Sequence, residues 1–333
     1  MRHIRYLLIV GWMLPLSCAL LPKGGDDGER AKYPVYRLAK APKIDGEVAG
    51  DAAWRTVPGV SGFRALGGDY TAAKQSTGKM GWTDDALFVA MVCEEPDVAL
   101  LKDKLKDGDP LWKDNGVEIF LELPGRPGVF QLAVNTIGSH AMGEGKLDIA
   151  KWQAAAKKGR NFWSLEMKLP FSCLEATPAP GARWHGAFCR NIWEYASGGD
   201  KFTTWPALET RFREPEHFAV LAFQDKSLSA EEAEQLARRM NEPYRKYLSD
   251  QIRELAKTAP KYRTALARAK KQKQFQKEAT ELQSAWQKIA GLSQDPATAP
   301  LTEIRQLVAR ANDIKTRSYE LKYRFLIEEL LEE

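Results

Sequence analysis

Two short segments place polar side chains where they could bind a ligand rich in hydroxyl groups. In the run GVEIFLEL, Glu118 and Glu122 alternate with apolar residues, and in VFQLAVN the same holds for Gln131 and Asn135. Because side chains alternate across a strand, each polar set shares one face. A hairpin of the two segments would gather a carboxylate and two amides, which suit a polyhydroxylated ligand. The same alternation is also typical of an ordinary solvated sheet face.

Two tryptophans lie in polar loops rather than in apolar runs. Trp112 belongs to DGDPLWKDNG and Trp205 to DKFTTWPALE, so neither is an obvious core residue. A flat indole packs well on the C–H face of a sugar ring while neighbouring groups bond its hydroxyls. These two tryptophans are therefore candidates for holding a sugar beside the polar face.

The elements around these residues read as short strands. Gly, Pro and Asp clusters separate the β-type segments ALFVAMVCE, GVEIFLEL, VFQLAVNTI, FWSLEMKLPF, RWHGAFCRNIW and HFAVLAF. No long run with helical periodicity interrupts them. This pattern predicts an all-β, antiparallel, immunoglobulin-like sandwich over residues 34–224.

The C-terminal part, residues 226–333, has a different composition. It is poor in glycine, and Ser229 and Glu232 form the pattern of a capping box. A long helix is expected from about Tyr262 to Ile289, followed by another after a loop. Their apolar residues repeat in steps of three and four, which predicts a helical hairpin, a bundle or a short coiled coil. This narrow apolar seam needs a partner helix, in the same chain or in another.

Charge and motifs exclude several classes of protein. The chain has 49 Lys and Arg against 44 Asp and Glu, and the net charge of +5 falls in the C-terminal part. It lacks the clustered basic stripe of a nucleic-acid-binding protein. The motifs GxSxG and HExxH and the nucleotide-binding loops do not occur. Glu118 and Glu122 would lie about 13 Å apart on one strand, which does not suit a retaining glycosidase.

The first residues have the pattern of an export signal. A basic start precedes the apolar run Tyr6–Leu16, which is shorter than the roughly 20 residues that span a bilayer. Residues 1–19 are expected to be a signal peptide, with cleavage after Ala19 or lipidation of Cys18 as the two outcomes. Residues 20–33 are expected to be a linker. The protein would then be secreted, periplasmic or attached to the cell surface, with a lipid as its only link to a membrane.

Three cysteines remain after the signal. Cys93 and Cys189 lie in strand-like segments and are the better candidates for a disulfide, which export would permit. The alternative is that both, together with Cys173, are buried thiols. The spacing gives no zinc signature.

Several segments together resemble carbohydrate-binding module family 9. They are APKIDGEVAGDAAW, GWTDDALFVAMVCEEPD, LWKDNGVEIFLE, QLAVN, NFWSLEMKLPF, GARWHGAFCRN and TTWPAL. The resemblance covers residues 34–224 and implies a sandwich of the DOMON type that binds glycans without cleaving them. It implies a clamp of Trp112 and Trp205, with hydrogen bonds from Glu118, Gln131 and Asn135. The sequence departs from the family pattern at Ala133, where an arginine is expected, and at Phe202, where an asparagine is expected.

Other functions stay open at this point. Haem-binding relatives of this sandwich use Met or His ligands, for which His140 and Met142 are the candidates. Some members of the family carry structural calcium, for which Asp84, Asp85 and Asp97 could supply oxygens. The sandwich could also be a degenerate scaffold whose helical tail mediates self-association or binds a protein partner.

Overall fold

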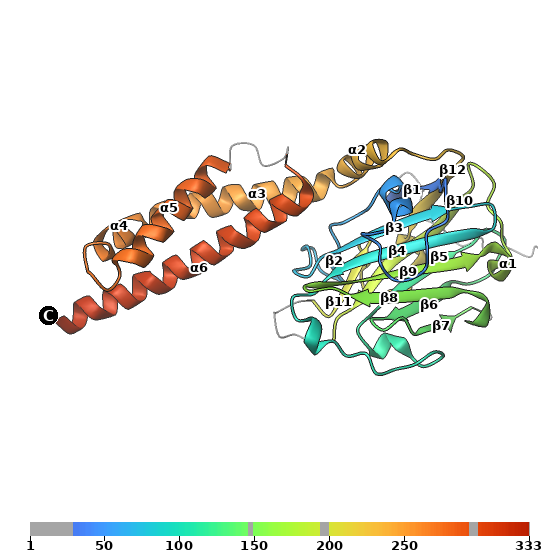
Figure 1. Cartoon of the computed structure of the whole chain (residues 1–333), viewed down its shortest axis with the longest axis horizontal. Helices are drawn as coiled ribbons and strands as arrows, with labels where there is room; N and C mark the ends of the chain where they lie inside the picture. Colours follow the sequence, from blue (N-terminus) through green and yellow to red (C-terminus); the bar gives the residue numbers. More distant parts are fainter. Residues whose placement is uncertain (1–28, 146–148, 194–199, 293–298, 333) are drawn as a thin grey trace, which may run out of the picture.

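The computed structural model describes residues 29–145, 149–193, 200–292 and 299–332, which form a β-sandwich and a helical arm (Figure 1). The expected signal peptide, Cys18 and most of the expected linker lie outside these residues. Within them, no helix combines the length and the apolar character needed to cross a membrane.

The sandwich is one large sheet that folds over a shared core. Its strand order is β7-β6-β5-β10-β12-β1-β3-β4-β9-β8, and β11 and β2 extend it beside β10. The bounds are β1 Lys32–Arg37, β2 Arg64–Ala65, β3 Ser76–Trp82, β4 Ala86–Glu94, β5 Gly116–Glu122, β6 Phe130–Asn135, β7 His140–Glu144, β8 Gln153–Lys158, β9 Phe162–Pro170, β10 Arg183–Asn191, β11 Phe202–Trp205 and β12 Ala219–Gln224. Short 3-10 helices η1 (Ala52–Thr56), η2 (Val98–Leu100), η3 (Leu111–Lys113), η4 (Ile149–Lys151) and η5 (Pro215–His217), and the single-turn helix α1 (Phe171–Leu174), lie in the connections.

All six predicted strands are confirmed, and the sandwich fold is as expected. The pairing is not purely antiparallel, however, because β1 lies between β12 and β3 and runs parallel to both. The linker expected over residues 20–33 also overlaps the first strand by two residues. β1 begins at Lys32, and its alternating residues Tyr33 and Val35 are fully buried in the core.

The expected disulfide between Cys93 and Cys189 is not formed, and the three cysteines of the described chain are buried thiols. Cys93 points into the main core between the two layers. Cys189 points to the other face of its strand, into a smaller cluster with Phe120 and Phe218. A disulfide needs its two Cβ atoms within about 4.5 Å, which side chains on opposite faces of the sheet do not achieve.

The helical arm begins with α2 (Ala230–Met240), and its predicted capping box is confirmed. The Ser229 side chain accepts from the Glu232 backbone, and the Glu232 side chain accepts from Ser229 N. The other helices are α3 (Glu242–Thr258), α4 (Pro260–Ala269), α5 (Gln276–Leu292) and α6 (Leu301–Glu332). They form a bundle that projects from the sandwich (Figure 1).

The expected single helix from Tyr262 to Ile289 is wrong, because the chain turns between α4 and α5. This turn lets the rings of Tyr262 and Trp286 stack with centroids 6.2 Å apart. In one continuous helix the two residues would lie roughly 36 Å apart. Burial of both rings against α6 therefore favours the break.

The apolar seam of α6 finds its partners within the same chain. Its buried residues Ala311, Ile314, Leu321 and Phe325 pack in one cluster with α4 and α5. Trp286 Nε1 also donates to Ser318 Oγ at 3.0 Å. The bundle is therefore completed without a second copy.

Candidate functional site

A cleft of about 620 Å³ lies on the face of the sheet that points away from the main core. Strands β5, β6 and β10 form its floor, and η3 and the loop after β11 form its walls. Its lining includes Leu66, Trp112, Lys113, Glu118, Phe120, Gln131, Glu144, Asn191, Trp193, Phe202, Thr210, Arg211, Phe212 and Arg213.

Glu118 occupies the floor of this cleft and is only 3% exposed. Asn191 Nδ2 donates to Glu118 Oε1 at 2.6 Å, and Gln131 Nε2 donates to Glu118 Oε2. Burial raises the pKa of Glu118, although the hydrogen bonds from Asn191 and Gln131 oppose the shift. Two amides therefore fix the orientation of a buried carboxyl group that faces the cavity.

The register of the strands explains why these three side chains meet. Glu118 stands beside Ala133 on β6 and beside Cys189 on β10. Both neighbours are small, so longer side chains from adjacent positions reach over them. The sequence did not indicate Asn191 as a site residue. It is the last residue of β10, and the run FCRNIW around it shows no alternation of polar and apolar residues.

Trp112 lies on η3 and forms one wall of the cleft. The loop before η3 is fixed by Asn135, whose Nδ2 donates to Leu105 O at 2.9 Å and to Asp114 Oδ2 at 3.3 Å. Asp114 Oδ2 in turn accepts from Leu105 N at 2.8 Å. Asn135 is fully buried and does not line the cleft. Asn135 was expected to contact the ligand. In the structure it instead positions the loop that carries Trp112.

The second tryptophan of the cleft is Trp193, whose indole Nε1 donates to the backbone carbonyl of Trp112 at 3.0 Å. Its ring meets Phe202 edge to face, with centroids 6.0 Å apart. Lys201 Nζ lies 3.9 Å from the ring centroid, a cation–π contact. Phe202, which stands where the resemblance leads one to expect asparagine, thus supports an aromatic wall.

Trp205 does not line this cleft, so the expected clamp of Trp112 and Trp205 is not what the structure forms. It pairs with Phe188 across β10 and β11, which places both side chains on the core face. Its ring contacts Tyr33 and Phe188 at centroid distances of 6.1 and 6.0 Å. Trp205 is partly buried by these contacts. Its polar neighbours in the sequence gave no sign of this packing, because β11 is only four residues long.

The opposite wall is a loop that Glu214 holds in shape. Its carboxylate accepts from the backbone amides of Glu209, Thr210 and Arg211 at 2.6 to 3.1 Å. Burial works against ionisation, but the hydrogen bonds from Thr210, the loop amides and His217 prevail and lower the pKa of Glu214 to about 2. The loop presents Phe212 to the cleft.

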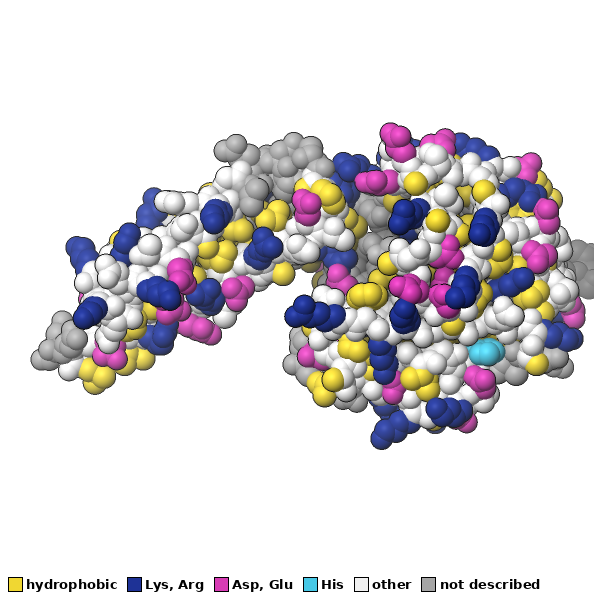
Figure 2. Space-filling model, viewed as in Figure 1, with side chains coloured by type: hydrophobic (Ala, Val, Ile, Leu, Met, Phe, Trp, Pro, Cys, Tyr) yellow, Lys and Arg dark blue, Asp and Glu magenta, His cyan; other side chains and the backbone are white. Residues whose placement is uncertain are grey.

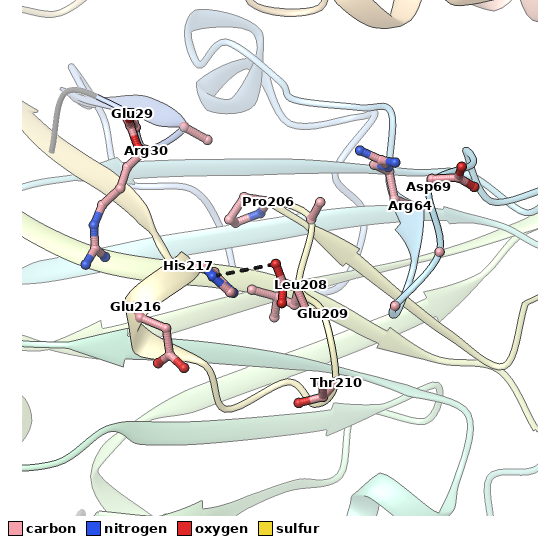
Figure 3. Close-up of a pocket in the computed structure, with 14 residues that line it drawn as sticks. Glu29, Arg30, Arg64, Asp69, Pro206, Leu208, Glu209, Thr210, Glu216 and His217 are labelled. Atoms are coloured by element: carbon pink, nitrogen blue, oxygen red, sulfur yellow. Dashed lines mark ion pairs between the residues drawn. The ribbon is translucent and has the colours of Figure 1, made fainter. Parts of the chain in front are cut away.

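A larger cavity of about 1050 Å³ is also lined by this loop, through Glu209 and Thr210 (Figure 3). Thr210 lines both cavities. Charges of both signs line the larger one, among them Arg64 and Glu216, and His217 Nε2 lies 3.9 Å from Glu209 Oε1. Its described lining contains no phenylalanine, tyrosine or tryptophan. It therefore offers no flat surface for a sugar, and the cleft at Trp112 is the better candidate.

Comparison with known proteins identifies the family. Residues 44–226 match the sequence model described as carbohydrate family 9 binding domain-like. The chain belongs to this family. No curated protein shows significant sequence similarity to it.

Two similar solved structures are a family 9 carbohydrate-binding module from Caldicellulosiruptor kristjanssonii in complex with cellotriose and with glucose. The cellotriose complex is 20% identical, with a TM-score of 0.45 over 59% of this chain and 95% of that chain. The glucose complex is 19% identical, with a TM-score of 0.45 over 59% and 97%.

His140 and Met142 were the candidates for a haem-binding site, and Asp84, Asp85 and Asp97 were those for a calcium site. His140 packs its ring against Trp152 at 4.4 Å, and Met142, two residues further along β7, packs against the same main core to which Trp152 belongs. Asp84 and Asp97 flank opposite ends of β4, roughly 30 Å apart, so they cannot share one calcium ion. The described residues contain no group of three or more His, Cys, Asp or Glu that could hold a metal.

Proposed function

We propose that the family 9 domain binds a glycan in the cleft lined by Trp112 and Trp193 and releases it unchanged. The observation that carries this proposal is a buried carboxyl group, Glu118, oriented by two amides at the foot of an aromatic wall. Carboxylate and amide groups pair with sugar hydroxyls, while aromatic rings pack on the C–H faces of the ring. Membership of the family supports the same function.

The cleft suits binding better than hydrolysis. Both oxygens of Glu118 already accept hydrogen bonds from amides, which hold the carboxyl group in one orientation. Glycoside hydrolysis needs two carboxyl groups that act together across the scissile bond. The second carboxylate of the lining, Glu144, pairs with Arg213 at 2.8 Å. We therefore expect a bound oligosaccharide to keep its mass during prolonged incubation.

The test is a glycan array followed by calorimetry on the bound glycan. Trp112→Ala should weaken binding at least about tenfold, which corresponds to about 1.4 kcal/mol. Tyr323→Ala, which removes an exposed ring on α6, is the matched control and should bind as the unchanged chain does. Undiminished binding by folded Trp112→Ala would refute the assignment of the cleft.

Export is a further part of the proposal and rests on the N-terminal sequence alone. Residues 1–19 carry the basic start, the apolar run and the small-residue site of a secretory signal. Mass spectrometry of the protein from its natural source distinguishes the two outcomes. A chain that begins at Leu20 indicates cleavage after Ala19, a lipid on Cys18 indicates anchoring, and an intact Met1 contradicts export.

A second candidate role, pairing of two chains through the arm, is favoured by the exposed end of α6. Ile327, Leu330 and Leu331 are 56%, 71% and 77% exposed, and Figure 2 shows hydrophobic side chains at the outer end of the arm. An apolar patch on a helix end is typical of a contact surface. Sedimentation of the full chain against a 1–226 truncation tests this role, and monomers in both samples would exclude it.

A further inference from the structure

A separate cavity of about 460 Å³ lies where the helical arm meets the sandwich. The sandwich contributes residues of η1 and β3, and the arm contributes α2, α3 and the start of α6. The two parts are joined here by Asn241, which donates from Nδ2 to Gly59 O at 2.8 Å and accepts from Ser61 N at 2.7 Å. These hydrogen bonds hold together the two sides of the cavity, which we call the junction cavity.

Cations predominate in this junction cavity. Arg55 and Lys79 reach it from the sandwich, and Arg238 and Arg245 reach it from the arm. Glu234 is the single acidic residue among the described lining residues, and its carboxylate lies 3.9 Å from Arg238. Four positive side chains thus face one negative side chain.

Lys79 is the cation of this cavity whose charge is least compensated by its described neighbours. Its Nζ donates to the backbone carbonyl of Trp54 at 2.6 Å. Among the described residues, no carboxylate contributes to its electrostatic surroundings, and burial lowers the pKa of Lys79 to about 8. An ammonium group that is partly removed from water and has no opposite charge beside it is destabilised, and the binding of an anion relieves this cost.

The first turn of α6 adds to the positive field. Pro300, Leu301 and Thr302 line the cavity, and α6 continues from there for 32 residues. Figure 1 shows that this end of α6 is the one nearest to the sandwich. The N-terminus of a long helix carries unpaired backbone N–H groups and a partial positive charge, which favour anions.

We propose that the junction cavity binds an oxyanion, either a free phosphate or sulfate ion or the same group on a small sugar. The cavity volume falls in the range of small-molecule sites, so it admits more than a bare ion. Phosphate and sulfate match the forked donors of arginine and the point charge of lysine. Such a ligand contacts both the sandwich and the arm and holds them together.

Calorimetry on the full chain with phosphate, sulfate, glucose 6-phosphate and glucose tests the proposal. We expect binding of the three anions and none of glucose at this site. Tighter binding of glucose 6-phosphate than of phosphate identifies a sugar-borne group as the ligand, and the reverse order identifies the free ion. Because Trp112 lines the glycan cleft and not the junction cavity, Trp112→Ala should leave the binding of the anions unchanged.

Two variants and one control complete the test. Arg238→Ala, on the surface of α2, should weaken phosphate binding about tenfold, as expected for one charge-assisted hydrogen bond. Lys79→Met should have a similar effect. Arg239→Ala removes the adjacent exposed arginine, which does not line the cavity, and should change nothing. Absence of anion binding, or equal losses in Arg238→Ala and Arg239→Ala, would overturn the proposal.

Discussion

The indole N–H of Trp193 is bonded to the backbone carbonyl of Trp112, so one aromatic residue of the cleft fixes the other. Trp112 lies on a short 3-10 helix between strands, whereas Trp193 follows β10. The contact joins segments that are 81 positions apart in sequence. The aromatic side of the cleft is therefore preorganised, which lowers the entropic cost of binding a ligand.

Removal of this bond should weaken glycan binding even when an aromatic ring is kept. Trp193→Phe removes the N–H donor, so the Trp112 loop loses one anchor, and we expect an affinity loss of about fivefold for a bond worth about 1 kcal/mol. Trp193→Ala also removes the ring and should lose more. Calorimetry with the glycan found on the array measures both, and equal affinity of Trp193→Phe and the unchanged chain would contradict this prediction.

Trp205 should matter for stability rather than for direct ligand contact. Its ring packs against Tyr33 and Phe188 in the core, so Trp205→Ala leaves a cavity there. Because Trp205 is only partly buried, we expect a loss of about 2 kcal/mol, below that of a fully buried tryptophan. Urea unfolding measures the loss. A variant of normal stability that no longer binds glycan would instead restore Trp205 to the binding site.

Glu118 should make the stability of the sandwich depend on pH. Because burial raises its pKa, its neutral form is favoured by folding, so its contribution is present at pH 4 and is lost as the pH rises through the raised value. Glu118→Gln stays neutral throughout. Its stability relative to the unchanged chain should therefore be higher at pH 7 than at pH 4, as urea unfolding at both values would show. A difference that does not change with pH would contradict this.

Glu214 should act with the opposite sign. Its pKa is lowered to about 2, so its contribution is present above the ordinary value near 4.5 and is lost as the pH falls through about 2. Glu214→Gln should lower stability at pH 7, and the deficit should shrink on acidification towards pH 3. The variant should also bind glycan more weakly, because its loop presents Phe212 to the cleft. If Glu214→Gln binds glycan as tightly as the unchanged chain, the loop that carries Phe212 does not contribute to glycan binding.

The boundary of the domain should lie before β1, although the family match begins at residue 44. β1 occupies the middle of the sheet, between β12 and β3. A chain of residues 44–333 lacks this strand and should be unfolded, whereas residues 29–333 should give a cooperative transition by circular dichroism. Equal transitions for the two chains would show that β1 is dispensable.

The three strands that form the floor of the cleft, β5, β6 and β10, could be predicted because each is a run of five or more alternating or apolar residues. β8, with the sequence QAAAKK, was missed because its small and charged residues carry no such pattern. Glu118 and Gln131 were placed correctly together because a simple hairpin joins their strands. The partner from β10, Asn191, depends on a pairing between distant segments that sequence periodicity does not encode.

The two tryptophans show the same limit in another form. Trp112 and Trp205 have equally polar neighbours, yet one faces a cleft and the other faces the core. The difference arises from β11, whose pairing with β10 assigns each of its side chains to a face. For the helical arm, the three- and four-residue steps predicted the buried seam, but they did not show where the chain turns between α4 and α5.

The parallel pairing of β1 with β12 also has a consequence for the order in which the domain assembles. Arg37, at the end of β1, bonds Asp225 just after β12, and the two are 188 positions apart. During synthesis, β1 emerges long before the strand that covers its edge. The sheet can close only after the last strand has been made, and contacts of such high sequence separation slow folding. Until then the first strand of the domain presents an open edge, which is the surface at which newly made chains are most exposed to mispairing.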